Sequence, residues 1–571
     1  MKTGYIDNSL KTETPNFLTS LESGRLRWDL LHPFPEQDPE ERRVGDALVA
    51  EVGEFLESDL DAGELDRTGE FPLELVEAYK ERGYHKLLAA EDVGGRALPY
   101  YTVFRFIEQV ASRSVPAAQV VGLTNTAGAQ ALLPVLSGPL RDYVRRRVED
   151  GIICAFGDTD PQGQNNRFVN LTVTPAEDGS GYVINGRKLF TANGPITDLI
   201  VVSATLVENG ERSVAAAFVE TSDPGFSVVT PIQFLGSKGL PNAALRFDDI
   251  RVPRERVLKA VEEPELAPRV GAVALVGRVL SVGGPATALA RNCLAWSRDF
   301  ARRRRIDGRG LGDYDEIQRI LATSMAEVFA VETVVQWCLL GPQPTHRWFE
   351  QLVTKNISTT HAWRTLDRTM SLMGGEGFET EHSKRRRGAD PIPLERAFRD
   401  ARGLRIVANV DFQLDNETAH LLLNRLYRGQ ADPLEADLGF DVEAMGGADL
   451  NPANLAHLEE AARQVRRFAE TCWDLVRRHP DPAELLAKEN LIIQISRVAT
   501  ELFTMCAVLS RTSLLAGQGT DVQELADIVC TEARHRLAEL WRRLSPQTEP
   551  DYAGTSRALL AGDAMEFLHH R

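Results

Sequence analysis

The spacing of apolar residues changes twice along the chain. In residues 43–149 apolar positions recur every three or four residues, as in ALVAEVGEFL and FRFIEQVA, which predicts amphipathic helices. In residues 152–257 apolar and polar positions alternate, which predicts strands, with a turn at Asp178-Gly179. Helical spacing returns near residue 270 and continues to about residue 427. The pattern therefore predicts a β region between two helical regions.

Two further segments flank this core. The first forty residues carry no regular spacing and include the Pro-rich DLLHPFPEQDPEE, so we expect them to be irregular. The hydrophilic stretch RGQADPLEADLGFDVEAMGGADLNPAN has the composition of a linker, and amphipathic spacing resumes after it. We therefore expect an α+β chain with an N-terminal extension (1–42), an N-terminal helical domain (43–151), a central β domain (152–258), a C-terminal helical bundle (268–430) and an appended helical domain (450–571).

Composition narrows the class of protein. The 571 residues are 43% hydrophobic, enough for several cores. A net charge of −17 disfavours nonspecific binding to nucleic acid or to an anionic membrane. The six cysteines stand singly, so we expect neither a disulfide framework nor a metal site. The first residues do not resemble a secretory signal and no apolar run approaches the length of a membrane span, so we expect a cytoplasmic protein.

Three segments carry a family pattern. Residues 181–258 contain GYVINGRKLFTANGPITD and QFLGSKGLPNAALRFDDIRVPRERVL, and residues 393–402 read PLERAFRDAR. Together they resemble the acyl-CoA dehydrogenase superfamily of FAD enzymes, over roughly residues 43–430. The resemblance implies FAD as cofactor, a small acyl substrate (a CoA or carrier-protein thioester, or a free acid) and a homodimer that pairs through the bundle. The appended helices resemble those of the very-long-chain members.

A flavin dehydrogenase needs polar groups at the edge of the isoalloxazine ring. The family places a T-E-P-x-A-G-S-D loop there, which TDPQGQNN matches at residues 159–166. The resemblance implies flavin contacts from Thr159, from Phe156 and Asp158 just before it, and from Asn165 in place of the family's serine.

A second motif, N-G-x-K-x-W-I-T-N-G, covers the flavin face in the family. The chain reads NGRKLFTANG at residues 185–194, so Phe190 takes the tryptophan position and can stack beside the ring. Ala192 takes the position of the threonine that would bond flavin N5. An Asn-Gly pair can also be only a hairpin turn.

Two motifs are implied to hold the adenine and pyrophosphate across a subunit interface. R-x-x-F-G-[RK] is matched from Arg304, with Asp307 replacing the phenylalanine and Asp315 a glutamine. Two carboxylates near a pyrophosphate are unfavourable by charge. Q-x-x-G-G-x-G-[FY] is matched at residues 371–378, which implies contacts from Met373, Gly374 and Gly375. The basic insertion EHSKRRRGADPIP is either a phosphate contact or an ordinary surface loop.

The residue that removes the substrate's α-proton is missing. Family members use a carboxylate, supplied by I-Y-E-G-T or by an earlier E-R-x-x-x-x-G-G. Ala408 and Gly277 stand at these two positions. Asp411, three residues past Ala408 and nearly one helical turn away, is the candidate replacement, although a capping or surface aspartate gives the same pattern.

Three functions remain open at this stage. The first is an FAD-dependent oxidoreductase of acyl-CoA dehydrogenase type acting on an acyl thioester or related acyl acid. The second is a flavin-dependent decarboxylating desaturase or monooxygenase of a natural-product pathway, similar to the epoxyketone synthases, which needs no base because loss of CO2 generates the enolate. The third is a catalytically silent scaffold subunit.

Overall fold

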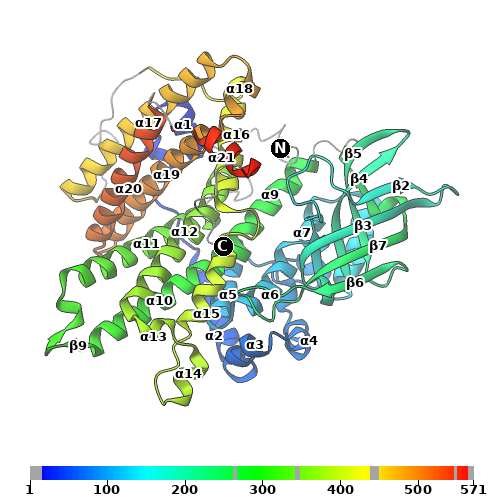
Figure 1. Ribbon diagram of the computed structural model, residues 1–571, viewed down its shortest axis with the longest axis horizontal. Helices are drawn as coiled ribbons and strands as arrows, with labels where there is room; N and C mark the ends of the chain where they lie inside the picture. The colour runs from blue at the N-terminus through cyan, green and yellow to red at the C-terminus, as the bar shows by residue number, and fades with distance from the viewer. Residues whose placement is uncertain (1–15, 261–265, 341–346, 437–448, 546–549, 563–571) are drawn as a thin grey trace.

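The computed structural model describes residues 16–260, 266–340, 347–436, 449–545 and 550–562. An eight-stranded sheet lies at one end of the molecule, and N-terminal helices cover the side of the sheet that faces the rest of the protein. A helical bundle with further helices makes up the other end (Figure 1). The expected α+β architecture is confirmed.

The N-terminal helices pack through α5 and α6. Ser114 ends α5 and caps α6, because its hydroxyl accepts a hydrogen bond from the Ala117 amide. Small and apolar residues on all sides of α6 leave it almost wholly buried. The helices are α1 (Phe17–Ser23), α2 (Pro39–Asp59), α3 (Ala62–Thr68), α4 (Leu73–Glu81), α5 (Tyr100–Arg113), α6 (Val115–Thr126), α7 (Ala129–Leu132) and α8 (Gly138–Glu149).

The expectation of an irregular N-terminus is wrong for residues 17–23, which form α1. Phe17, Leu18 and Leu21 are buried, and the Phe17 ring lies 5.5 Å from that of Phe503 in the appended helices. A helix this short is stabilised by its packing rather than by its own propensity, so periodicity alone does not reveal it.

The sheet runs in the order β6-β7-β3-β2-β4-β5-β8, with β1 parallel to β4. Its buried face carries the alternating residues that the sequence pattern predicts, among them Ile184, Val202 and Phe247. The strands are β1 (Cys154–Gly157), β2 (Thr172–Pro175), β3 (Gly181–Ala192), β4 (Leu199–Glu208), β5 (Glu211–Glu220), β6 (Phe226–Pro231), β7 (Asn242–Pro253) and β8 (Val257–Lys259).

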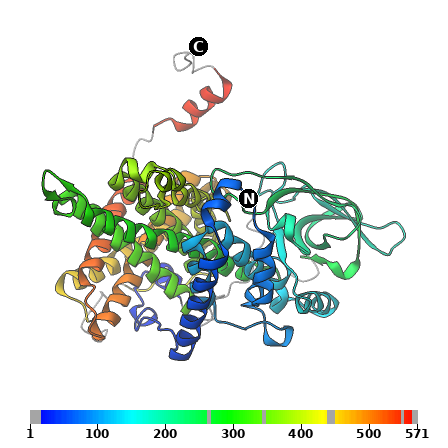
Figure 2. The ribbon, with the colours of Figure 1, turned by 90° about the horizontal axis from the view of Figure 1, so that it is seen from below.

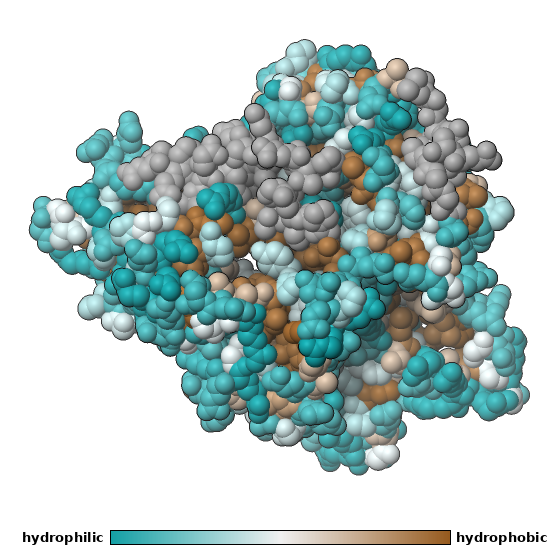
Figure 3. All heavy atoms as spheres, turned by 180° about the vertical axis from the view of Figure 1, so that it is seen from behind, coloured by the Kyte–Doolittle hydropathy of each residue, from teal (hydrophilic) through white to brown (hydrophobic). Residues whose placement is uncertain are grey.

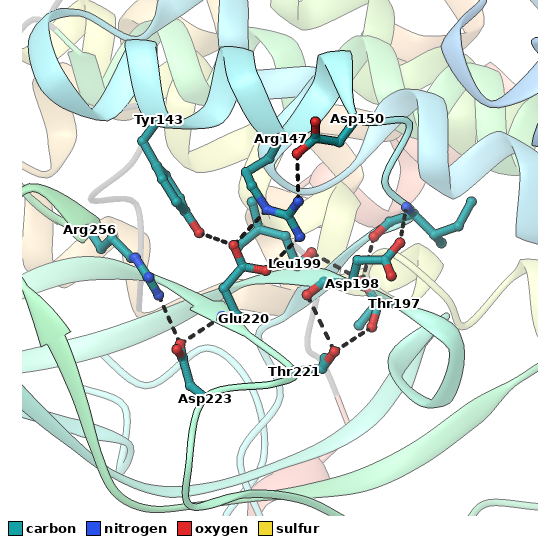
Figure 4. A network of polar contacts seen from close by, with 11 residues as sticks. Tyr143, Arg147, Asp150, Thr197, Asp198, Leu199, Glu220, Thr221, Asp223 and Arg256 are labelled. Carbon is teal, nitrogen blue, oxygen red and sulfur yellow. Dashed lines mark hydrogen bonds and ion pairs between the residues drawn. The ribbon is translucent and has the colours of Figure 1, made fainter.

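Polar contacts fix α8 against the sheet (Figure 4). Glu220 at the end of β5 accepts hydrogen bonds from the Tyr143 hydroxyl at 2.5 Å and from Arg147 at 2.7 and 2.9 Å. Asp223 receives a further hydrogen bond from Arg256 at 2.9 Å. These contacts hold the N-terminal helices and the sheet in a fixed relation.

The C-terminal helices begin with a continuous rod in which α9 passes through a π-helical turn, Val279–Gly283, into α10. The remaining helices of this region follow a short hairpin. Its two strands, β9 (Arg305–Ile306) and β10 (Arg309–Gly310), have two residues each. The helices are α9 (Leu266–Arg278), α10 (Gly284–Arg303), α11 (Asp315–Leu340), α12 (Trp348–Met373), α13 (Gly375–Phe378), α14 (Glu381–Arg386), α15 (Leu394–Leu404) and α16 (Asp411–Tyr427).

The appended helices share a core with the bundle. Phe503 of α19 packs edge-on against Phe349 of α12, with ring centroids 6.2 Å apart. Figure 2 shows α21 standing away from the main body. The helices are α17 (Pro452–Arg478), α18 (Pro482–Leu486), α19 (Glu489–Gly517), α20 (Gln523–Leu544) and α21 (Tyr552–Ala561).

Three helical segments are long and apolar enough to cross a membrane by length and composition alone, although the sequence shows no unbroken apolar run of that length: Arg269–Arg303, Asp315–Leu340 and Glu489–Gly517. Scattered polar residues hide them from a search for unbroken apolar runs. Between 67% and 78% of each apolar window is buried inside the protein. On the face seen from behind, hydrophilic side chains form most of the surface and hydrophobic ones gather toward its middle (Figure 3).

Candidate active site

Phe190 projects from an irregularity in β3. The pairing of β3 with β7 slips by one residue between Lys188 and Thr191, and Phe190 has a φ of 54°. Bulky residues rarely adopt positive φ, and β-bulges redirect side chains at functional sites. Phe190 is 55% exposed, and its ring lies 6.2 Å from that of Phe234. The strand therefore holds an aromatic face open toward solvent, as a planar ligand requires. Asn185-Gly186 lies within the same strand and is not a hairpin turn.

The loop after β1 lies beside Phe190. The Leu189 amide donates to the Thr159 carbonyl at 2.8 Å, so Thr159 neighbours the bulge. Phe156, three residues earlier, is 44% exposed although the residues on either side of it are buried. The sequence prediction thus brings Phe156, Thr159 and Phe190 to one region of the sheet.

A buried ion pair, missed at the sequence level, anchors this loop. The Lys188 ammonium donates to the Asp160 carboxylate at 2.8 Å, to the Asp158 carbonyl at 2.9 Å and to the Ser203 hydroxyl at 3.0 Å. Both charged side chains are fully buried. Asp160 stands where the first quoted motif has glutamate, and Lys188 stands where the second has lysine. The presence of an acidic residue in one motif and a basic residue in the other could have indicated this ion pair.

The other predicted cofactor residues of the sheet region differ in what they contact. Asp158 accepts a hydrogen bond from Gln164 at 2.7 Å, and Asn165 has a φ of 71°. Ala192 offers no hydroxyl. Thr191 has one, but it is buried without a hydrogen-bond partner in the described part of the chain, and its neighbouring position in the strand directs it to the other face. The donor that the family's threonine would supply is therefore not replaced by Thr191.

The second group of predicted cofactor residues lies at the far end of the bundle. Arg303 forms an ion pair with Glu376 at 2.5 Å, which brings the β9–β10 hairpin, with Arg304 at its base, next to Gly374 and Gly375. A Cβ atom at either glycine would meet nothing within 4 Å, so there is room for a ligand. Met373 is 3% exposed and packs into the core.

Asp307 has a structural explanation. Ile306 pairs with Arg309, which leaves Asp307 and Gly308 as a two-residue hairpin turn with φ values of 48° and 81°. Asp-Gly is a preferred pair for such a turn. The residue that replaces the family's phenylalanine therefore shapes the hairpin tip.

The two groups are well separated within one chain. In Figures 1 and 2 the β9–β10 hairpin and the sheet lie toward opposite ends of the molecule. Phe190 and Arg304 therefore cannot hold neighbouring parts of one ligand within a single chain.

The two usual base positions, which Ala408 and Gly277 occupy, lie in the helical half. Ala408 and Asn409 connect α15 to α16 with φ values of 57° and 77°. The Asn409 carbonyl accepts a hydrogen bond from the Lys355 ammonium at 2.7 Å, and its side chain donates to Glu417 at 3.2 Å. The loop is thus held from two helices, α12 and α16.

Gly277 is closed off by α6. A Cβ atom there would lie 2.8 Å from the Thr126 carbonyl oxygen, so any side chain must displace backbone. Thr126 and Ser281 also share a hydrogen bond between their hydroxyls. Ser281 belongs to the π-helical turn, a feature that occurs frequently at functional sites. This position therefore excludes a glutamate by space.

Asp411, the predicted replacement base, is already engaged. It accepts hydrogen bonds from Arg405 at 3.0 Å and from the Phe412 amide at 2.8 Å at the start of α16. Burial raises the pKa of Asp411, but the hydrogen bond and charge of Arg405 outweigh it and hold that pKa below its ordinary value. Such a carboxylate is a weak proton acceptor.

The matches to known protein families occur along the chain in the same order as the domains described above. Three family models match: acyl-CoA dehydrogenase N-terminal domain at 44–137, middle domain at 155–250 and C-terminal domain at 274–408. The probable acyl-CoA dehydrogenase FadE10 of Mycobacterium tuberculosis is 26% identical, over 97% of this chain and 89% of its own length. The human mitochondrial very long-chain specific acyl-CoA dehydrogenase is 25% identical, over 93% and 84%.

Solved structures share the fold. An acyl-CoA dehydrogenase complexed with FAD from Bacillus anthracis superposes with a TM-score of 0.75 at 17% identity, over 97% of this chain and 95% of that one. Butyryl-CoA dehydrogenase of Megasphaera elsdenii gives 0.59 at 21% identity, over 68% and 99%.

The residues present fit FAD. The outward-facing ring of Phe190 and the adjoining Thr159 loop are what a flavin ring needs. The chain belongs to the acyl-CoA dehydrogenase family, as a long-form, flavin-dependent oxidoreductase whose cofactor is FAD.

Proposed function

We propose that this enzyme oxidises an acyl thioester or related acyl acid by a route that does not use a glutamate of the protein. The observation that carries the proposal is the state of the two usual base positions. Ala408 has no proton-accepting group, and Gly277 has no space for one because Thr126 lies against it. The rest of the fold and the flavin region keep the family pattern.

The chain's own residues bind and orient the reactants. FAD, when bound, supplies the two-electron acceptor. Phe190 offers a stacking surface for the ring, and Thr159 offers a hydroxyl at its edge. Lys188 and Asp160 keep the Thr159 loop in place. Because Ala192 lacks a hydroxyl, the protein provides one hydrogen bond fewer to the flavin than the family motif does.

The same observation favours a second candidate, decarboxylation followed by desaturation or oxygenation. A β-keto acid loses CO2 by breaking the bond between its carboxyl carbon and its α-carbon, and the electron pair remains as an enolate. No proton has to be removed, so the absence of a base costs nothing. The pairing of Asp411 with Arg405 supports this route, because it engages the carboxylate that the sequence suggests as a replacement base.

We also infer a homodimer in the cytoplasm. The distance between the Phe190 and Arg304 ends of one chain supports pairing, because a second copy can bring its hairpin to the first copy's sheet. All six cysteines are free and buried, as expected in a reducing compartment. Light scattering tests the dimer, and a monomer contradicts it.

The absorbance spectrum of the purified protein tests the function. We expect flavin bands that bleach anaerobically on addition of substrate. A protein that binds no flavin when reconstituted with FAD fits the silent scaffold and contradicts both enzyme proposals. Release of CO2 in step with bleaching selects the decarboxylating route, and bleaching without CO2 selects direct dehydrogenation.

A further inference from the structure

A cluster of charged side chains surrounds the loop that carries Ala408. The members come from α9, α12, the loop itself, α16 and α19. They are Arg278, Lys355, Arg405, Asp411, Asp415, Glu417 and Arg497.

Four members form two closed pairs. Arg405 pairs with Asp411, and Arg497 donates to Asp415 at 2.8 Å. The Asn356 amide completes the second pair by donating to Asp415 at 2.9 Å. These pairs balance their own charges and leave Arg278, Lys355 and Glu417.

Arg278 lacks a full complement of partners. Its Nη1 atom is buried and has no hydrogen-bond partner in the described part of the chain. Glu417 Oε2 is 3.8 Å away, which is too long for a hydrogen bond. A buried guanidinium nitrogen without an acceptor is unfavourable, so an anion that reaches it would be stabilised.

Lys355 forms no close ion pair in the described part of the chain, although the charges of Asp411 and Asp415 favour its protonated form. Its side chain is fully buried, and its hydrogen bond goes to the Asn409 carbonyl, which is neutral. Burial and, to a smaller extent, the charge of Arg278 lower the pKa of Lys355 to about 7, so this lysine is charged only in part near neutral pH. Arg278 is therefore the cation that a further carboxylate would stabilise most.

The missing charge has a definite place. Position 408 adjoins Asn409, the residue that contacts both Lys355 and Glu417. A glutamate at position 408, as in the family motif, would bring a carboxylate to this cluster, and Ala408 does not. With alanine at position 408, the substrate is the remaining source of a carboxylate for Arg278.

We propose that Arg278, supported by Lys355, recognises a carboxylate of the substrate itself, placed next to the reacting carbon as in a β-keto acid. This inference rests on the proposed function and names its substrate class. In this proposal the substrate carries the carboxylate that a glutamate of the protein supplies in the family motif.

The same cation suits the loss of CO2. A guanidinium presents several N–H groups in one plane and can hold the carboxylate and the keto oxygen together. When the bond between the carboxyl carbon and the α-carbon breaks, CO2 leaves and the electron pair spreads from the α-carbon to the keto oxygen. The negative charge therefore moves from one oxygen to another within reach of Arg278, which stabilises the enolate. No oxidant or proton is needed for this step.

The test compares two probes of nearly the same shape, one anionic and one neutral: a malonic acid half-amide with an alkyl chain, and the corresponding diamide. Calorimetric titration of the flavin-loaded protein should give about a tenfold preference for the acid, a modest value for a charge-assisted hydrogen bond. Arg278→Met should remove this preference. Arg256→Met is the matched control, because Arg256 is also a partly buried, ion-paired arginine but lies in the β domain, and it should keep the preference.

Ala408→Glu provides a second variant that does not disturb Arg278. It supplies the missing carboxylate from the protein, so the acid probe should again lose its advantage. Equal affinities for the two probes in the unmodified protein, no binding of the acid, or a preference that survives both changes overturns the inference.

Flavin content measured on the same samples separates this inference from the proposed function. Protein that holds FAD but shows no acid preference overturns the carboxylate site and leaves the oxidoreductase proposal intact. Protein that takes up no flavin but prefers the acid supports the carboxylate site and overturns the oxidoreductase proposal.

Discussion

The sheet region around Phe190 and the loop around Ala408 have diverged from the family pattern in different ways. At the sheet, the substitutions are mild and the supporting structure is kept, including the buried pair of Lys188 and Asp160. At the loop between α15 and α16, Ala408 stands at the position where the family motif has a carboxylate, and the buried Nη1 atom of Arg278 has no hydrogen-bond partner among the described residues. We propose that this fold retains its cofactor site while its proton chemistry changes.

The largest expected effect is at the sheet. Lys188→Met leaves Asp160 as an unpaired buried carboxylate, so the free energy of unfolding should fall by about 3–5 kcal/mol. Flavin should be lost with it, because Thr159 lies in the same loop. Denaturant unfolding and flavin absorbance measure the two effects.

Arg251→Met is the control for that variant, because Arg251 forms an exposed pair with Asp178. Its removal should change stability by less than about 1 kcal/mol. A Lys188→Met protein as stable as this control would show that the buried pair does not support the flavin region.

Restoring a glutamate should succeed at one base position and fail at the other. Ala408→Glu should fold and speed oxidation of saturated acyl-CoA by about 10²-fold, the lower end for a general base. Gly277→Glu meets the Thr126 carbonyl, so it should lose about 1–3 kcal/mol of stability and gain no activity.

Unfolding curves measure the change in stability of both variants, and initial rates measure the change in their activity. Equal gains in rate at positions 277 and 408 would mean that α6 moves aside easily. No gain at position 408 would mean that the loop does not face the substrate.

The charge of Lys355 makes a pH-dependent contribution to stability. Its pKa in the folded protein, about 7, lies below the ordinary value of 10.5. Between these values the unfolded chain binds more protons, so the free energy of unfolding should rise with pH by up to about 1.4 kcal/mol per pH unit. Below pH 7 the lysine is charged in both states and the contribution is constant.

Lys355→Met should remove this slope. Urea unfolding of both proteins at pH 7 and pH 9 measures it, with the neighbouring charges of Arg278, Arg405, Asp411 and Asp415 unchanged between the two. A stability difference that stays the same at both pH values would mean that Lys355 has an ordinary pKa in the folded state.

The smallest expected effect is at Thr159. Exchange for valine removes a hydroxyl at the predicted flavin edge, so flavin affinity should fall by about 1 kcal/mol, or roughly fivefold. Reconstitution with FAD followed by dialysis measures it. Unchanged occupancy and redox behaviour would place the loop away from the ring.

Sequence patterns could predict the order of domains and the outward position of Phe190, because both follow from periodicity and from a contiguous motif. They could not predict α1, whose helix depends on contacts with Phe503, nearly five hundred residues later. The contact of Gly277 with Thr126 and the unpartnered Nη1 atom of Arg278 among the described residues also escape a sequence pattern. Each depends on side chains that different helices bring together, and a motif records residue types but not what faces them.

We propose that the reaction proceeds without a base supplied by the protein. The decisive experiment is anaerobic mixing of the flavin-loaded enzyme with a β-keto acyl acid and, separately, with saturated acyl-CoA, in the unmodified protein and in Asp411→Asn. We expect flavin bleaching and stoichiometric CO2 with the β-keto acid in both proteins, and very slow bleaching with saturated acyl-CoA from butyryl to palmitoyl. Rapid bleaching by saturated acyl-CoA that survives the Asp411 change would contradict it.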